Sequence, residues 1–253
     1  MGSFIPYFGG KNRLAKTIIS KFPDHGCYVE VFAGGAHVLF RKEPSHAEVL
    51  NDLDRDLVTL YRVIKHHPEE LHRQFKYSLI SRDEFRRERE VNPDTLTDIQ
   101  RAARYLYLQK TAFGGKSVGQ TFGTATTHAP RLNFLALEST LEAAWERLAR
   151  VTIECMDYKE LIKRYDRPHT LFFLDPPYYE IPGYKHNFVE QDFLDLANQL
   201  ATIKGRFLMT INDHPEVRQI FKRFTIEEAT LKYSVTTTQN GRAKTRTELI
   251  ITN

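Results

Sequence analysis

The chain is poor in cysteine, with two among 253 residues, and it contains no apolar run long enough to span a bilayer. Cys27 and Cys155 lie in apolar stretches without the paired spacing of metal ligands, so we expect no disulfide framework and no metal site. The N-terminus lacks the basic, apolar and small-residue pattern of a signal peptide. These absences predict a protein of the reducing cytoplasm that does not associate with membranes.

A strong excess of charge of one sign is also missing, because the formal net charge is only +4 and the isoelectric point is near 8.9. This balance permits a polyanionic partner but does not require one. One region concentrates arginines among acidic residues, which fits a solvated helical face as well as a phosphate-binding one. These arginines are Arg82, Arg86, Arg87, Arg89, Arg101 and Arg104.

Short β-prone runs alternate with segments of helical periodicity, a pattern typical of a mainly parallel sheet covered by helices on both faces. The expected strands are Tyr28 to Phe32, Ala47 to Leu50, Val151 to Cys155, Leu171 to Leu174 and Phe207 to Ile211. The expected helices are Lys11 to Lys21, Asp54 to Lys65, Ile99 to Lys110, Leu137 to Ala149 and Phe188 to Ile203.

The C-terminal part predicts an antiparallel hairpin, because Leu231 to Thr238 and Thr247 to Thr252 are β-prone and flank an Asn240-Gly241 turn. Residues 66–150 separate the second and third strands. They are helical and charged at first and then become a glycine-rich loop, which in a compact enzyme is usually functional. We therefore expect a core formed by residues 1–65 and 151–253, with residues 66–150 as an inserted lobe.

The strongest chemical motif is Asp175-Pro176-Pro177-Tyr178, directly after the buried run that ends at Leu174. Ligands of open α/β sheets bind at such strand ends. The two prolines supply no backbone donors, so the carboxylate and the free carbonyls form a site made of acceptors only. Such a site can hold the two N–H bonds of an exocyclic amine through Asp175 and the Pro176 carbonyl, while Tyr178 offers a stacking face for a base.

Two weaker motifs are typical of ligand-binding turns. The run from Tyr28 through Glu30, Phe32 and Gly34 to Ala36 leads from a strand into small residues that let a ligand approach the backbone. Asp52 follows the next strand, where a carboxylate commonly holds ribose hydroxyls, although Asp54 and Asp56 are competitors and can cap the following helix. At the N-terminus, Gly9-Gly10-Lys11 precedes a helix and suits a carboxylate or a phosphate.

Together these motifs resemble the bacterial and bacteriophage DNA adenine methyltransferase family. The resemblance covers PYFGGK, YVEVFAGGAHVLF, LNDLDRDLVTLYRVIK, the Cys155 to Tyr158 stretch, LDPPYY, TINDH and TELII, in that order. It implies an α/β fold with a Rossmann-like mixed seven-stranded sheet, an antiparallel final strand and an inserted, mainly helical target-recognition lobe. It also implies transfer of a methyl group from S-adenosylmethionine to N6 of a flipped-out adenine in double-stranded DNA.

The resemblance assigns the cofactor pocket to Tyr7, Gly10, Lys11, Glu30, Phe32, Gly34, Asp52, Asp157 and Asp175. Asp175, Pro176, Pro177 and Tyr178 form the catalytic strip. For DNA contact, the expected residues of the lobe are Arg101, Arg104, Lys110 and Lys116, joined by Arg242 in the hairpin 236–246. A monomer is expected.

One segment departs from the family. Lys110 is followed by Thr111-Ala112-Phe113-Gly114-Gly115-Lys116 instead of Arg-Tyr-Gly-Tyr-Asn-Gly, so the resemblance does not fix the recognised sequence. Three other functions stay open: methylation of adenine N6 in RNA, methylation of cytosine N4 in DNA, and DNA binding without catalysis. A small-molecule methyltransferase is disfavoured by the large lobe. Cytosine C5 transfer needs a nucleophilic thiolate, and neither cysteine stands at a proline-flanked strand end.

Overall fold

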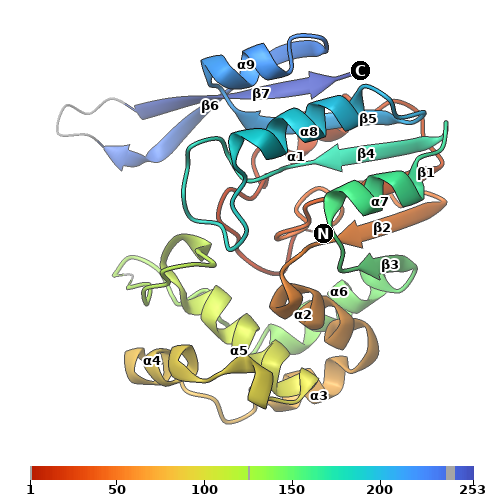
Figure 1. Ribbon diagram of the computed structural model, residues 1–253. Coiled ribbons are helices and arrows are strands. Elements are labelled where there is room, and N and C mark those ends of the chain that lie inside the picture. The colour runs from red at the N-terminus through yellow and green to blue at the C-terminus, as the bar shows by residue number, and fades with distance from the viewer. Residues whose placement is uncertain (1, 125, 238–242) are drawn as a thin grey trace.

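The computed structural model describes residues 2–124, 126–237 and 243–253, and within these ranges the side chains of residues 230–246 are not described. The fold is a seven-stranded mixed sheet with the strand order β3-β2-β1-β4-β5-β7-β6 (Figure 1). Strands β1 to β5 are parallel, and β7 is antiparallel to both of its neighbours. This confirms the expected α/β fold with its antiparallel final strand.

The strand order reverses between β1 and β4, which are neighbours in the sheet although their first paired residues, Cys27 and Thr170, are 143 positions apart in the sequence. Chain connections leave β1 and β4 in opposite directions at this point, so a crevice opens at their carboxyl ends. The strands are β1 (Cys27–Glu30), β2 (Ala47–Asn51), β3 (Val151–Glu154), β4 (Thr170–Leu174), β5 (Arg206–Asn212), β6 (Thr225–Thr237) and β7 (Ala243–Thr252).

Two sequence expectations for the strands need correction. Strand β1 ends at Glu30, two residues before the expected end at Phe32, because the chain turns there toward the crevice. The hairpin is longer than expected, since β6 begins at Thr225 and β7 at Ala243. The expected Asn240-Gly241 turn lies outside the described residues.

Alternating side chains divide the sheet into two hydrophobic layers. In β4, Leu171 and Phe173 join the layer that also contains α1, whereas Phe172 and Leu174 face α7, α8 and α9. Because helices cover both faces, β1 and β4 are buried along their whole length. These helices are α1 (Ala15–Ile19), α7 (Tyr158–Tyr165), α8 (Glu190–Leu200) and α9 (Pro215–Ile220).

Side-chain caps fix where several helices begin. Asp54 accepts a hydrogen bond from the Asp56 amide at the start of α2, and Thr97 forms a reciprocal capping box with Gln100 at the start of α5. By contrast, Leu14 gives α1 no side-chain cap, which explains why this helix is shorter than the expected Lys11 to Lys21. The sequence analysis did not assign ranges to α3, α4, α7 and α9.

Residues 66–150 contain most of the helices between β2 and β3, which lie below the sheet in Figure 1. They share a hydrophobic cluster with one face of the sheet, and α2 packs against α3, α5 and α6. No helix within the described residues is both long and apolar enough to cross a membrane. The elements are α2 (Arg55–His66), α3 (Pro68–Arg73), α4 (Arg82–Glu90), η1 (Pro93–Thr95), α5 (Asp98–Thr111), η2 (Phe113–Gly115) and α6 (Leu137–Leu148).

Candidate active site

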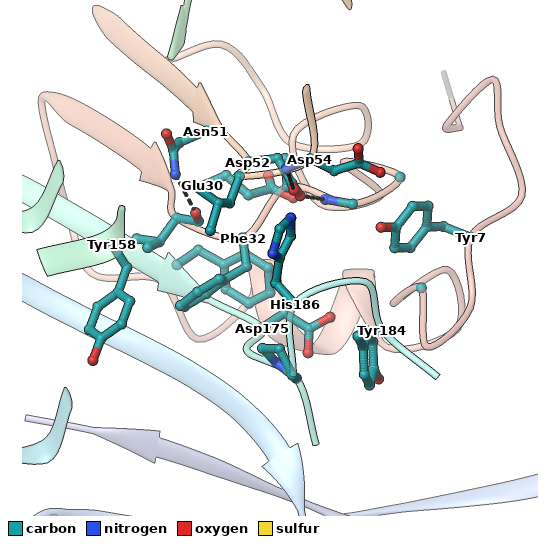
Figure 2. A pocket seen from close by; sticks show the side chains of 18 of the residues that line it. Tyr7, Glu30, Phe32, Asn51, Asp52, Asp54, Tyr158, Asp175, Tyr184 and His186 are labelled. Atoms are coloured by element: carbon teal, nitrogen blue, oxygen red, sulfur yellow. Dashed lines mark hydrogen bonds between the residues drawn. The ribbon is translucent and has the colours of Figure 1, made fainter. Parts of the chain in front are cut away.

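A pocket opens in the crevice at the carboxyl ends of β1, β2, β3 and β4, as the strand order predicts (Figure 2). It encloses about 940 Å³ of space when the solvent at its open mouth is included. Its lining includes all nine residues that the sequence predicted for the cofactor pocket. They are Tyr7, Gly10, Lys11, Glu30, Phe32, Gly34, Asp52, Asp157 and Asp175.

The turn after β1 brings backbone to the floor of this pocket. Gly34 adopts a φ of +47°, and a Cβ atom there would lie 2.8 Å from the ring of Tyr7. A side chain at this position would therefore be strained and would also displace the tyrosine. The Gly34 carbonyl accepts a hydrogen bond from the Tyr61 hydroxyl at 2.7 Å, which holds the turn against α2.

Asp52 lies at the end of β2 and is tied to this turn. Its carboxylate accepts hydrogen bonds from the Gly34 amide and the Asp54 amide, each at 2.9 Å. Burial raises the pKa of Asp52 to about 6 in spite of these two bonds. Figure 2 shows the His186 ring pointing into the pocket near this carboxylate. Asp54, the competitor considered in the sequence, caps α2 instead.

Glu30 and Phe32 lie on opposite sides of the turn. The Glu30 carboxyl accepts hydrogen bonds from the Tyr28 hydroxyl at 2.9 Å and the Leu39 amide at 3.0 Å, and burial raises its pKa to about 8. The Glu30 carboxyl group is therefore mainly protonated at neutral pH, and its hydrogen bond with the Leu39 amide supports the turn after β1. The ring of Phe32 packs against Tyr158 and Phe188, with centroids 5.8 Å and 5.6 Å away. These rings give the pocket an aromatic wall.

Asp157 follows β3 and caps α7 by accepting a hydrogen bond from the Lys159 amide at 2.8 Å. The residue is exposed and lines the pocket. The sequence analysis missed Asn51, whose side chain joins the Val31 carbonyl to the backbone of Met156. The sequence feature that could have identified Asn51 is its position as a polar residue at the end of a buried strand.

Lys11 joins the N-terminal segment to the catalytic strip. Its buried ammonium lies 2.6 Å from Oδ1 of Asp175 and donates hydrogen bonds at 2.8 Å to the Tyr178 hydroxyl and 2.9 Å to the Gly9 carbonyl. Burial lowers the pKa of Lys11, but the carboxylates of Asp175 and Glu248 outweigh this and raise it. The ammonium is thus charged in the folded protein.

The catalytic strip leaves β4 with its acceptors facing the crevice. Asp175 accepts a further hydrogen bond from Thr210 at 3.1 Å, and its pKa is raised by burial, an effect that Lys11 and Thr210 partly offset. Beyond the two prolines, Tyr179 is fixed by paired hydrogen bonds with the Asn212 side chain at 2.9 Å and 3.1 Å. Within the described part of the chain, no hydrogen bond uses the Pro176 carbonyl.

A second cavity lies beside the first and shares Phe8 and Tyr184 with it. Tyr178 lines this second cavity, whereas Asp175 lines the first, and Lys11 contacts both side chains. The catalytic strip therefore contributes residues to both of the neighbouring cavities. The remaining lining residues are Gly9, Ile181, Asn212, Asp213, Thr247 and Glu248.

The segment 184–188 covers part of the first pocket and was not expected from the sequence as part of the site. The Lys185 ammonium binds Asp54 at 2.7 Å and Asp56 at 3.0 Å, both at the start of α2. Asp56 is also paired with Arg101 of α5 at 2.5 Å. One carboxylate thus connects the pocket cover to the helical segment.

The residues expected to contact DNA are distributed unevenly. Arg101 is engaged by Asp56 and Asp94, and Arg104 donates hydrogen bonds to the carbonyls of Glu88 and Arg89. These bonds use two of the five N–H donors of each guanidinium, and a role in DNA contact stays a prediction. Lys116 is exposed and Lys110 is half-buried beside a cavity described below. Arg242 lies outside the described residues.

The comparisons with known proteins agree on one family. A family model for D12 class N6 adenine-specific DNA methyltransferases matches residues 7–235. The type II methyltransferase M1.LlaDCHI of Lactococcus lactis subsp. cremoris is 27% identical over 99% of this chain and 94% of its own length. The type II methyltransferase M.MjaIII of Methanocaldococcus jannaschii is 23% identical over 99% and 98%. A DNA adenine methylase of Haemophilus influenzae is 24% identical over 98% and 92%.

Proposed function

The chain belongs to the family of D12 class N6 adenine-specific DNA methyltransferases, and on this premise we propose which of its residues hold the cofactor, the target base and the DNA. It is a site-specific DNA methyltransferase that acts on N6 of adenine. This family membership disfavours the three alternatives left open by the sequence: adenine in RNA, cytosine N4, and binding without catalysis.

S-adenosylmethionine is the proposed methyl donor, and the first pocket suits it. Asp52 offers a buried carboxylate for ribose hydroxyls, the Phe32, Tyr158 and Phe188 rings offer an apolar wall for adenine, and Asp157 lies at the rim for its amino group. Lys11 is the cation nearest to the pocket wall at the other end, where it would hold the carboxylate of the donor. When bound, the cofactor supplies an electrophilic methyl group on a sulfonium ion.

The second cavity is the proposed place of the target adenine. An adenine ring stacked on Tyr178 would bring its N6 amine to the strip, where Asp175 and the Pro176 carbonyl accept its two N–H bonds. Oδ1 of Asp175 is occupied by Lys11 and Thr210, whereas Oδ2 accepts only from Lys11 and has a second lone pair for this purpose. Holding both protons in acceptors frees the nitrogen lone pair for the methyl group, so catalysis depends on position and electrostatics.

The partner is double-stranded DNA from which the target adenine is flipped, since N6 is not accessible inside a duplex; this costs a few kcal/mol, offset by stacking in the cavity. Residues 66–150 are the proposed target-recognition lobe, with residues 1–65 and 151–253 as the catalytic core. We further propose a monomer that acts in the cytoplasm, where the free thiols of Cys27 and Cys155 would stay reduced.

One observation supports this assignment most: Asp175 lines a cavity suited to a nucleoside, Tyr178 of the same strip lines a neighbouring cavity suited to a base, and the Pro176 carbonyl between them is used by no hydrogen bond of the described residues. The test combines purified enzyme, duplex DNA and labelled cofactor with nucleoside mass spectrometry. We expect N6-methyladenine only, and long-read sequencing of DNA from expressing cells would give its sequence context. N4-methylcytosine, or labelled RNA in preference to DNA, would contradict the proposal.

A further inference from the structure

A separate cavity lies inside the helical segment, away from the catalytic strip. Its walls come from the end of α5, from the η2 turn and from residues 122–124. Backbone hydrogen bonds hold these walls together: the Phe113 amide donates to the Thr121 carbonyl at 2.7 Å, and the Gly123 amide donates to the Thr111 carbonyl at 2.8 Å. The cavity is therefore a built feature of the glycine-rich segment and does not depend on a single loose loop.

The lining of this cavity is apolar and cationic. Phe113, Phe122 and Ile80 form apolar walls, Lys110 projects from the last turn of α5, and Arg131 lies exposed at the edge. Among the described residues that line the cavity, which also include Thr111, Thr124 and His128, none is acidic. Such a lining favours a flat ligand that presents acceptor atoms on its edge.

Lys110 is the polar residue best placed to bind such an edge. Its side chain is half-buried, and within the described residues it forms no ion pair and no side-chain hydrogen bond. Burial lowers the pKa of Lys110, and no acidic group offsets this. A partly desolvated ammonium without a partner gains more from an acceptor than a solvated surface lysine does.

The cavity is also linked to the target-base site. The Phe8 amide donates a hydrogen bond to the Gly115 carbonyl at 2.9 Å, and Phe8 lines the cavity that contains Tyr178. The Gln109 side chain reinforces this junction by donating to the carbonyls of Pro6 at 2.9 Å and Gly115 at 2.7 Å. Gly114, which directly precedes Gly115, lines the cavity inside the helical segment, called the lobe cavity below. The turn that carries Gly114 and Gly115 therefore connects the lobe cavity to the target-base cavity through direct hydrogen bonds.

We propose that this cavity receives the edge of a guanine near the target adenine and that Lys110 recognises it by donating hydrogen bonds to O6 and N7. The proposal rests on the proposed function and adds one element of its sequence specificity. Lysine or arginine paired with these two guanine atoms is the commonest specific contact between proteins and DNA. A backbone phosphate fits less well, because it would leave the aromatic walls unused and is held as easily by exposed cations.

The test compares the parent enzyme with Lys110→Met and Lys110→Arg on duplexes that carry the recognised sequence, each guanine being replaced in turn by 2-aminopurine, which lacks O6. At one position the replacement should lower kcat/KM of the parent by about 5- to 150-fold. Lys110→Met should show the same loss on normal DNA and no further loss with 2-aminopurine there, whereas Lys110→Arg should retain discrimination. Lys76→Met removes an exposed lysine that lies over Tyr77, and this control should behave like the parent.

Three outcomes would overturn the inference. The first is a recognised sequence that contains no guanine. The second is that Lys110→Met weakens binding to all sequences equally and lowers the salt dependence of binding by about one phosphate contact. The third is that 2-aminopurine lowers kcat/KM of the parent and of Lys110→Met by the same factor at every position. Circular dichroism and the melting temperature verify that each variant folds. Because the parent must methylate adenine in the same assay, a failure of the proposed function is seen separately, as the absence of N6-methyladenine from all reactions.

Discussion

The ammonium of Lys11 lies 2.6 Å from Oδ1 of Asp175, which places the two charges in contact at the boundary between the two cavities of the site. Because both side chains are largely buried, with 3% and 18% of their surface exposed, water screens this pair much less than a surface pair. Lys11 also binds the Tyr178 hydroxyl, so one cation orients both the acid and the ring of the catalytic strip.

Replacing Asp175 with alanine should abolish methyl transfer, because one of the two acceptors for the adenine amine is lost. Duplex affinity should stay within a few fold of the parent, since the lobe is unchanged. Single-turnover assays and fluorescence anisotropy measure the two quantities. Asp195→Asn, which breaks an exposed ion pair with Lys159 far from the strip, is the matched control and should keep full activity. Retained turnover in Asp175→Ala would contradict the central assignment.

Much of the core could be predicted from the sequence because its signals are local. A buried run that stops at an acid and two prolines identifies the end of β4, and a small-residue turn identifies the end of β1. The seven-stranded sheet with its antiparallel final strand was implied by the family resemblance, because periodicity alone does not predict which strands pair. The bounds of α2, which Asp54 caps, and of α6, which has no side-chain cap, were both predicted to within one residue from their helical periodicity.

Features that depend on contacts distant in sequence were missed. Lys185 is separated from Asp54 by 131 residues, and nothing in its neighbourhood indicates that the segment 184–188 covers a pocket. Arg101 was expected to contact DNA because it lies in a basic cluster, but its partner Asp56 is 45 residues away. Charge patterns identify residues that can bind a phosphate, and only the fold decides which of them already have partners.

Asp52→Ala should chiefly weaken cofactor binding, because the buried carboxylate is the proposed acceptor for the ribose hydroxyls. The pH dependence gives a second check. Burial raises the pKa of Asp52 to about 6, so protonation below that pH removes acceptor capacity and should lower cofactor affinity. Calorimetry at pH 5.5 and 7.5 should show this loss in the parent but a flat profile in the variant. If Asp52→Ala binds cofactor as tightly as the parent, another residue holds the ribose.

Lys185→Met should accelerate release of the cofactor by about five-fold, the effect of losing about 1 kcal/mol from a half-exposed ion pair. The reason is that the ion pairs to Asp54 and Asp56 hold the segment 184–188 over the pocket. Stopped-flow displacement of a fluorescent cofactor analogue measures the rate. Lys21→Met, which loses an ion pair with Glu227 outside the pocket lining, is the control. Equal release rates in parent and Lys185→Met would show that the segment is held by its aromatic contacts.

Glu30→Gln should change how the stability of the protein depends on pH. Burial raises the pKa of Glu30 to about 8, from about 4.3 in an unfolded chain. Between these values the folded state binds more protons than the unfolded state, so in the parent this residue makes the free energy of unfolding fall as pH rises. Glutamine stays neutral and keeps an acceptor for Tyr28 and Leu39. The melting temperature of the variant should therefore gain on the parent from pH 5 to pH 8 and level off above that.

Glu48 on the neighbouring strand provides a control of opposite sign. Although burial by itself raises its pKa, the ion pairs with Arg147 and Lys42 outweigh this and lower it. The charge of Glu48 therefore contributes stability at neutral pH that is lost as pH falls below about 4.3. Glu48→Gln should melt below the parent at pH 7, with a deficit that shrinks in acid. Parallel melting curves for Glu30→Gln and the parent across pH 5 to 8 would mean that Glu30 is ionised in the folded protein, and that its carboxylate supports the turn as a charge.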